Sequence, residues 1–117
     1  MRIVAGIVLA SALCPAGPAA AQSFGVASFF AAVDAQGTTL QGSGIQASKR
    51  AARGQYIVVF TRPVTSCAFA TSVRSNAGGH ASVSGPGGND QRVVVKTFSS
   101  AGAVANRAFD VIAFCAP

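Results

Sequence analysis

Short runs of β-branched and aromatic residues alternate with clusters of Gly, Ser, Asn and Pro along the chain. No stretch keeps a helical spacing of apolar residues for three turns, so the pattern is typical of an all-β domain. Two packed antiparallel sheets, a β-sandwich, are the simplest architecture for this many short strands. The pattern predicts about seven strands, near residues 26–33, 44–49, 55–61, 68–74, 80–83, 92–99 and 108–115.

A tight hairpin is predicted between the second and third of these strands. Its loop is Ala51-Ala52-Arg53-Gly54, in which Gly54 can take the positive φ that such loops demand. In the strand that follows, Tyr56, Val58 and Phe60 share one face, while residues 57, 59 and 61 share the other. Both rows are largely apolar, which predicts a central strand that is at least partly covered on both sides.

Residues 1–21 have the three regions of a signal peptide. Arg2 precedes an apolar run at residues 3–13, and a segment of small residues ends in Ala19-Ala20-Ala21. Cleavage after Ala21 would leave residues 22–117 as one secreted or periplasmic domain. The apolar run is shorter than the roughly 20 residues of a membrane span, so none is expected after processing. Cys14 leaves a lipoprotein signal as the alternative, although Leu13 stands where a small residue is usual.

The processed chain keeps two cysteines, Cys67 and Cys115. An even pair in an exported protein predicts a disulfide, and the alternative of a metal site is disfavoured because His80 is the only histidine. Each cysteine lies in line with an apolar row of its strand. We therefore expect a bridge between two core-facing strands, and neither a metal nor a cofactor.

The processed chain is basic, with eight Lys and Arg residues against three Asp, a net charge of +5. This charge favours anionic partners, and for an exported protein these are envelope polymers, lipid headgroups or an acidic protein before nucleic acid. The predicted binding patch is Lys49, Arg50 and Arg53 around the hairpin, with Arg62 at the far end of its second strand. The alternative is a solvated hairpin tip whose charges deter edge-to-edge aggregation.

No motif indicates catalysis. His80 has no nucleophile elbow near it, and Asp34, Asp90 and Asp110 are isolated from one another in the sequence. Residues 85–90 lack the Lys-Ser/Thr of a phosphate loop and offer one carboxylate for calcium, so they are predicted to be a turn. The geometry of the glycine-rich loops at residues 76–90 is left open.

These observations predict a non-enzymatic surface module that acts by adhesion, envelope association or self-assembly. Whether it forms a homo-oligomer is left open. The alternative is a cationic effector or inhibitor that binds anionic envelope components or an acidic protein through the basic hairpin.

Two stretches carry a family resemblance. The first stretch runs through Gly42-Ser43-Gly44-Ile45, Gly54-Gln55-Tyr56-Ile57-Val58-Val59-Phe60 and Val64-Thr65-Ser66-Cys67-Ala68-Phe69-Ala70-Thr71. The second stretch runs from Val93-Val94-Val95-Lys96-Thr97 to Asn106-Arg107-Ala108-Phe109-Asp110-Val111-Ile112-Ala113-Phe114-Cys115. They resemble the patterns G-Y-x-V-x-F…V-x-x-C-A-Y-x-A-T and V-x-V-x-T…D-R-P-F-x-V-x-V-x-C of small secreted bacterial proteins, which are similar to β-rich modules at the ends of phage tail fibres.

The resemblance covers most of residues 29–115. It implies a β fold with a disulfide between Cys67 and Cys115, and it brings no catalytic residues. Asn106, Ala108 and Phe69 depart from the pattern, which has Asp, Pro and Tyr at these places.

Overall fold

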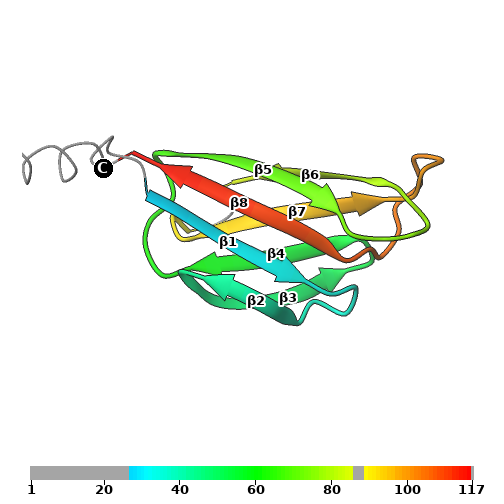
Figure 1. The fold of residues 1–117 in the computed structure, drawn as a ribbon, viewed down its shortest axis with the longest axis horizontal. Helices are drawn as coiled ribbons and strands as arrows, with labels where there is room; N and C mark the ends of the chain where they lie inside the picture. The colour runs from blue at the N-terminus through cyan, green and yellow to red at the C-terminus, as the bar shows by residue number, and fades with distance from the viewer. Residues whose placement is uncertain (1–26, 86–88, 117) are drawn as a thin grey trace, which may run out of the picture.

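Eight antiparallel strands form two four-stranded sheets that pack face to face in the computed structural model (Figure 1). The structure describes residues 27–85 and 89–116, so the predicted signal peptide and its cleavage site lie outside the described residues. The strands are β1 (Ala27–Val33), β2 (Thr39–Ser43), β3 (Ile45–Ala52), β4 (Gln55–Phe60), β5 (Cys67–Val73), β6 (His80–Ser84), β7 (Arg92–Phe98) and β8 (Phe109–Cys115).

One sheet has the strand order β2-β1-β8-β5 and the other β3-β4-β7-β6. In Figure 1, β1 and β8 cross in front of β4 and β7, so the central pairs of the two sheets cover each other. The predicted β-sandwich is confirmed, and β4 is a central strand as expected. Among the described residues, no helix has the length and apolar character of a membrane span.

The sequence prediction missed β2. Most of this edge strand is exposed and it contains only one large apolar residue, Leu40, so it lacks the alternation by which a half-buried strand is recognised. The chain then changes sheets at Gly44, which has φ +75°. A Cβ atom there would collide with the Phe29 ring, so the corner requires glycine. The predicted strand at residues 44–49 is in fact β3, which starts after this corner and extends to Ala52.

The β3–β4 hairpin is confirmed, but its loop is shorter than predicted. Ala52 pairs with Gln55, which leaves Arg53 and Gly54 as a two-residue turn. Gly54 has φ +66°, as the hairpin requires, and its N–H donates to Asn106 Oδ1 over 2.7 Å. An aspartate, which stands here in the pattern that the sequence resembles, could accept the same hydrogen bond.

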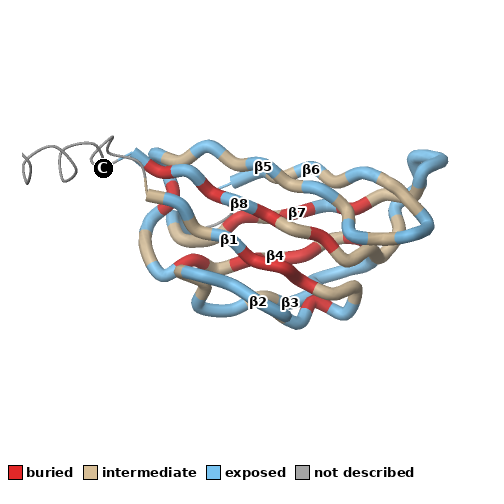
Figure 2. Tube along the Cα trace, in the orientation of Figure 1, coloured by how far each residue is buried: buried red, intermediate tan, exposed pale blue. Residues whose placement is uncertain are grey.

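The core lies between the two central strand pairs, where Figure 2 shows the buried residues concentrated. Tyr56 on β4 and Phe109 on β8 bring their ring centroids within 5.0 Å across the sandwich. Both side chains are fully buried. The contact therefore joins a central strand of one sheet to a central strand of the other.

The predicted disulfide between Cys67 and Cys115 is confirmed. The two residues are directly opposite each other in the β5–β8 register, so the bridge links neighbouring strands of one sheet. β5 is an edge strand of that sheet. The bridge thus holds an edge strand and the last strand together at the end where each would otherwise fray.

Tyr56 gives a prediction for alkaline pH. Its hydroxyl donates to the Ala35 carbonyl over 2.7 Å, and burial raises the pKa of its phenol above the ordinary value. Between that ordinary value of about 10 and the raised one, the unfolded state binds fewer protons than the folded state, so stability falls as the pH rises. We expect Tyr56→Phe to cost about 1 kcal/mol at neutral pH and to remove this part of the alkaline loss. Urea unfolding of both proteins from neutral pH to about pH 11 measures the two effects. Parallel curves over the whole range would contradict the alkaline part.

Candidate anion-binding face

The structure separates the four cations of the predicted patch. Lys49 points outward from β3, because it pairs with Ile57 on the solvent side of the sheet. Arg50 pairs with Tyr56, so its side chain leaves the edge strand on the opposite side. Arg53 stands in the hairpin turn beyond both strands. These three cations are close in sequence, but they do not share a face.

Arg62 lies at the other end of the hairpin. It follows β4 at the end where Ile45 pairs with Phe60, nine positions after Arg53, which is roughly 30 Å along an extended strand. Its Nε donates to the Pro63 carbonyl over 3.1 Å, and its guanidinium lies 5.8 Å from the centre of the Phe29 ring. Arg62 is therefore held by local contacts and is not brought to the hairpin tip.

A different group of cations shares one surface, the outer side of the β3-β4-β7-β6 sheet. The pairings Lys49↔Ile57↔Val94 and Gln55↔Lys96↔Ser82 place Lys49 and Lys96 in adjacent cross-strand rows. Arg92 stands in the next row, opposite Val59. We call this surface the cationic face; its cations are Lys49, Arg92 and Lys96, and its floor is Ile57, Val59 and Val94. From strand spacing and rise, Lys49 lies roughly 12 Å from each of the other two at the Cα atoms.

The cationic face is hollowed between Lys49 and Arg92. The hollow has a volume of about 280 Å³ and is lined by Ala47, Ser48, Lys49, Ile57, Val59 and Arg92. Ile57 and Val59 are only partly buried, so the floor offers apolar contact, while the two cations stand at its border. Such a surface suits a ligand with an aliphatic backbone and regularly spaced negative charges.

Of the three acidic residues of the chain, Asp34 and Asp110 lie away from the cationic face, and Asp90 precedes Arg92 by two positions. Asp34 is in the β1–β2 turn, where its carboxylate accepts hydrogen bonds from the backbone N–H groups of Gln36 and Thr38. Asp90 is in the loop before β7, and Asp110 is on β8 in the other sheet. Among residues 27–85 and 89–116, no salt bridge engages Lys49 or Lys96. The cationic face therefore carries a local excess of positive charge.

Sequence reasoning missed Lys96 and Arg92 as partners of Lys49. Alternation along β7 does place Arg92, Val94 and Lys96 on one side of their strand. However, the pairing of β7 with β4 joins residues more than 30 positions apart, which local pattern does not reveal. The grouping of these cations with Lys49 is a product of the tertiary register.

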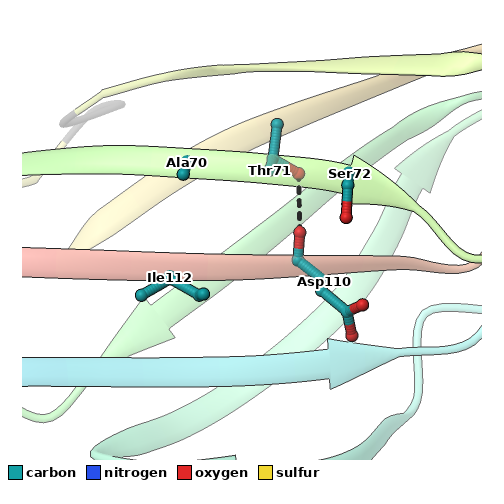
Figure 3. A pocket seen from close by; sticks show the side chains of 5 residues that line it. All are labelled: Ala70, Thr71, Ser72, Asp110 and Ile112. Atoms are coloured by element: carbon teal, nitrogen blue, oxygen red, sulfur yellow. Dashed lines mark hydrogen bonds between the residues drawn. The ribbon is translucent and has the colours of Figure 1, made fainter.

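The outer side of the other sheet has a smaller hollow of about 110 Å³ (Figure 3). It is lined by Ala70, Thr71 and Ser72 of β5 and by Asp110 and Ile112 of β8. The paired residues are Ala70↔Ile112 and Ser72↔Asp110. The hollow exists because the β5 side chains are small where those of β8 are larger.

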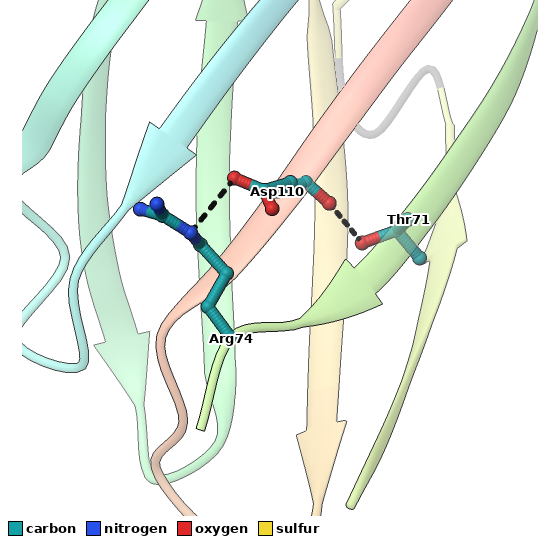
Figure 4. A network of polar contacts seen from close by, with 3 residues as sticks. All are labelled: Thr71, Arg74 and Asp110. Atoms are coloured by element: carbon teal, nitrogen blue, oxygen red, sulfur yellow. Dashed lines mark hydrogen bonds and ion pairs between the residues drawn. The ribbon is translucent and has the colours of Figure 1, made fainter. Parts of the chain in front are cut away.

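Asp110 takes part in a short polar network beside this hollow (Figure 4). Arg74 Nε lies 3.3 Å from Asp110 Oδ1, and the Thr71 hydroxyl donates to the Asp110 main-chain carbonyl over 2.8 Å. Both charged side chains are about 40% exposed, so the ion pair contributes little stability. It does fix the direction of the Asp110 carboxylate on this face.

The remaining candidate for chemistry, His80, lies at the start of β6, where its ring stacks on Phe98 with centroids 5.0 Å apart. Within the described ranges, no three His, Cys, Asp or Glu side chains gather as a metal site would require. Part of the predicted turn at residues 85–90 lies outside the described residues.

Comparison of the chain with protein-family models, with curated proteins and with solved structures gave no significant match.

Proposed function

We propose that this protein is an exported, non-enzymatic β-sandwich module that associates with the cell envelope by binding an anionic polymer on its cationic face. The observation that carries the proposal is the placement of Lys49 and Lys96 in adjacent rows of one sheet face, in a sheet whose four strands contain no acidic residue. The signal-peptide pattern at residues 1–21 and the disulfide support export. Anionic polymers are abundant outside the bacterial cytoplasm, so the charge and the expected location agree.

The electrostatics favour an extended polymer over a single small anion. The Cα atoms of the cations are roughly 12 Å apart, so all three side chains would have to bend over the apolar floor to share one phosphate or carboxylate. A chain with several negative charges would contact all three cations, and some of the polymer's counterions would be released when it binds. Because the sites are exposed, the attraction is screened by salt, with a Debye length of about 10 Å at 0.1 M.

Charge-reversal variants test whether the polymer binds to the cationic face or to the hairpin tip. We expect Lys49→Glu/Lys96→Glu to weaken binding of purified lipopolysaccharide or lipoteichoic acid by about tenfold or more, because each reversal replaces an attraction with a repulsion of similar size. Arg50→Glu/Arg53→Glu makes the same change in net charge near the same strand and is expected to weaken binding by less than about threefold. Titration at about 50 and 500 mM NaCl, followed by fluorescence anisotropy of labelled protein, measures both.

The result can also contradict the proposal. A larger loss for the hairpin variant would transfer the site to the tip, as the sequence alone predicts. Unchanged binding by both variants, or binding insensitive to salt, would remove the electrostatic basis altogether. Circular dichroism of the variants checks that the fold is retained, as expected for exposed positions.

A further inference from the structure

The second outer surface of the sandwich has the opposite character from the cationic face. Of the five large apolar side chains that are exposed within the described ranges, Phe30, Ile112 and Phe114 lie on the outer side of the β2-β1-β8-β5 sheet, 43%, 37% and 46% exposed. Phe30 pairs with Ile112, and Phe114 stands in the neighbouring row. We call Phe30, Ile112, Phe114, Ala68 and Ala70 the apolar face. Clustered apolar exposure of this kind marks an interaction surface.

The side chains of the apolar face change from large to small between neighbouring strands. Its large residues are on β1 and β8, whereas the β5 residues opposite β8 are small: Ala70 pairs with Ile112, and Ala68 pairs with Phe114. The hollow in Figure 3 is part of this change in size. Its volume of about 110 Å³ is somewhat below the roughly 150 Å³ of a cavity that holds benzene, so it suits the end of one apolar side chain.

We propose that the apolar face binds the same face of a second copy of this chain, in a two-fold homodimer. An axis parallel to the strands, between β8 and β5, would lay β8 of each subunit over β5 of the other. Ile112 would then fill the hollow beside Ala70 of the partner subunit, and Phe114 would cover Ala68 of the partner subunit. Large residues meet small ones in both directions, as a self-complementary interface requires.

The polar end of the surface fits the same arrangement. Asp110 and Ser72 are neighbours in one cross-strand row, so the two-fold axis brings the carboxylate of each subunit over the hydroxyl of the other. Asp110 stays paired with Arg74 of its own chain, which limits the cost of covering its charge. The nearly aligned strands also match the usual packing of one sheet on another. A partner of different sequence would need to supply both the protrusions and the hollow that this chain already contains.

The small area of the proposed interface limits the affinity of the dimer. The strands that overlap across this axis are β8 and β5, two columns of side chains over roughly 10 Å by 20 Å, and Phe30 on β1 lies outside the overlap. This is well below the ~800 Å² per partner of a standard stable interface. The dimer is therefore weak and depends on concentration. It would turn the two cationic faces outward on opposite sides, so that one dimer could hold two segments of polymer and gain avidity from both. Dimerisation itself does not depend on the proposed anion binding.

Sedimentation velocity of the oxidised protein, purified after export of the full chain, tests the dimer between about 10 and 500 µM. We expect the weight-average sedimentation coefficient to rise from the monomer toward the dimer value. Phe114→Ser removes a protrusion, and Ala70→Arg fills the hollow with a bulky charge; each is expected to weaken dimerisation by about tenfold or more. Val104→Ser is the matched control, because Val104 is 48% exposed in the β7–β8 connection, outside this face.

Three outcomes would overturn the inference. Wild-type protein could remain monomeric at the highest concentration, Val104→Ser could weaken association as much as Phe114→Ser, or the species formed could be a trimer, which a two-fold axis excludes. Because Phe114 and Ala70 are exposed, the variants should keep the wild-type unfolding midpoint at low concentration. Measuring that midpoint separates loss of the interface from loss of the fold.

Discussion

Removal of the disulfide is expected to lower the free energy of unfolding by about 4 kcal/mol. The bridge joins residues 48 positions apart, so its loss frees a long loop of the unfolded chain, and the estimate is the chain-entropy value for a loop of that length. A domain of this size has a total stability of only about 5–14 kcal/mol. The bridge would thus supply a large share of it.

Guanidinium unfolding of Cys67→Ala/Cys115→Ala measures this effect, with the reduced wild-type protein as a second reference. Alanine is preferred over serine because Cys115 is buried, and a hydroxyl there would add a desolvation cost of its own. Both proteins should have similarly lowered midpoints. An oxidised wild type no more stable than the double variant would mean that the edge strand β5 is held by packing and hydrogen bonds alone.

Phe109→Ala is expected to destabilise the protein by about 3–5 kcal/mol. Phe109 is fully buried on β8, and its ring contacts Tyr56 of the opposite sheet, so truncation opens a cavity between the two layers. β8 and β4, which carry the two rings, each have a hydrogen-bonded strand on both sides, which limits collapse into the space.

Phe114→Ala is the matched control for this truncation. It makes the same chemical change on the same strand, but the side chain points outward and is half exposed, so the expected loss is below about 1 kcal/mol at low protein concentration. Urea unfolding of the two variants measures the difference directly. Equal losses would show that the inner and outer faces of β8 are not energetically distinct.

The sandwich separates stability from surface contact by the alternation of its strands. On β4 and β8, one row of side chains builds the core and the next row faces solvent. The same strands therefore hold the disulfide and the aromatic contact on one side and offer a cationic or apolar surface on the other. The outer surfaces can change without altering the core, which is why charge and hydrophobicity at these positions are available for binding.

The sequence by itself determined the all-β class, seven of the eight strands and the disulfide. Alternating β-branched and aromatic residues specify which side of each strand is apolar, and two cysteines allow a single pairing. The same local signals did not reveal β2, because a mostly exposed edge strand needs no apolar row, and they made the hairpin loop two residues too long. Alanine at positions 51 and 52 fits a loop or an exposed strand equally well.

The surfaces were decided by the tertiary structure alone. Lys49 joins Lys96 and Arg92, and Phe30 joins Ile112 and Phe114, through pairings of strands that are distant in sequence. Arg50, although adjacent to Lys49, leaves on the other side of β3, and Arg62 lies at the opposite end of the hairpin. Alternation tells which residues of one strand share a face. The register between strands sets which residues of the neighbouring strands lie beside them. That register follows from packing of the whole core, so no local stretch of sequence contains it.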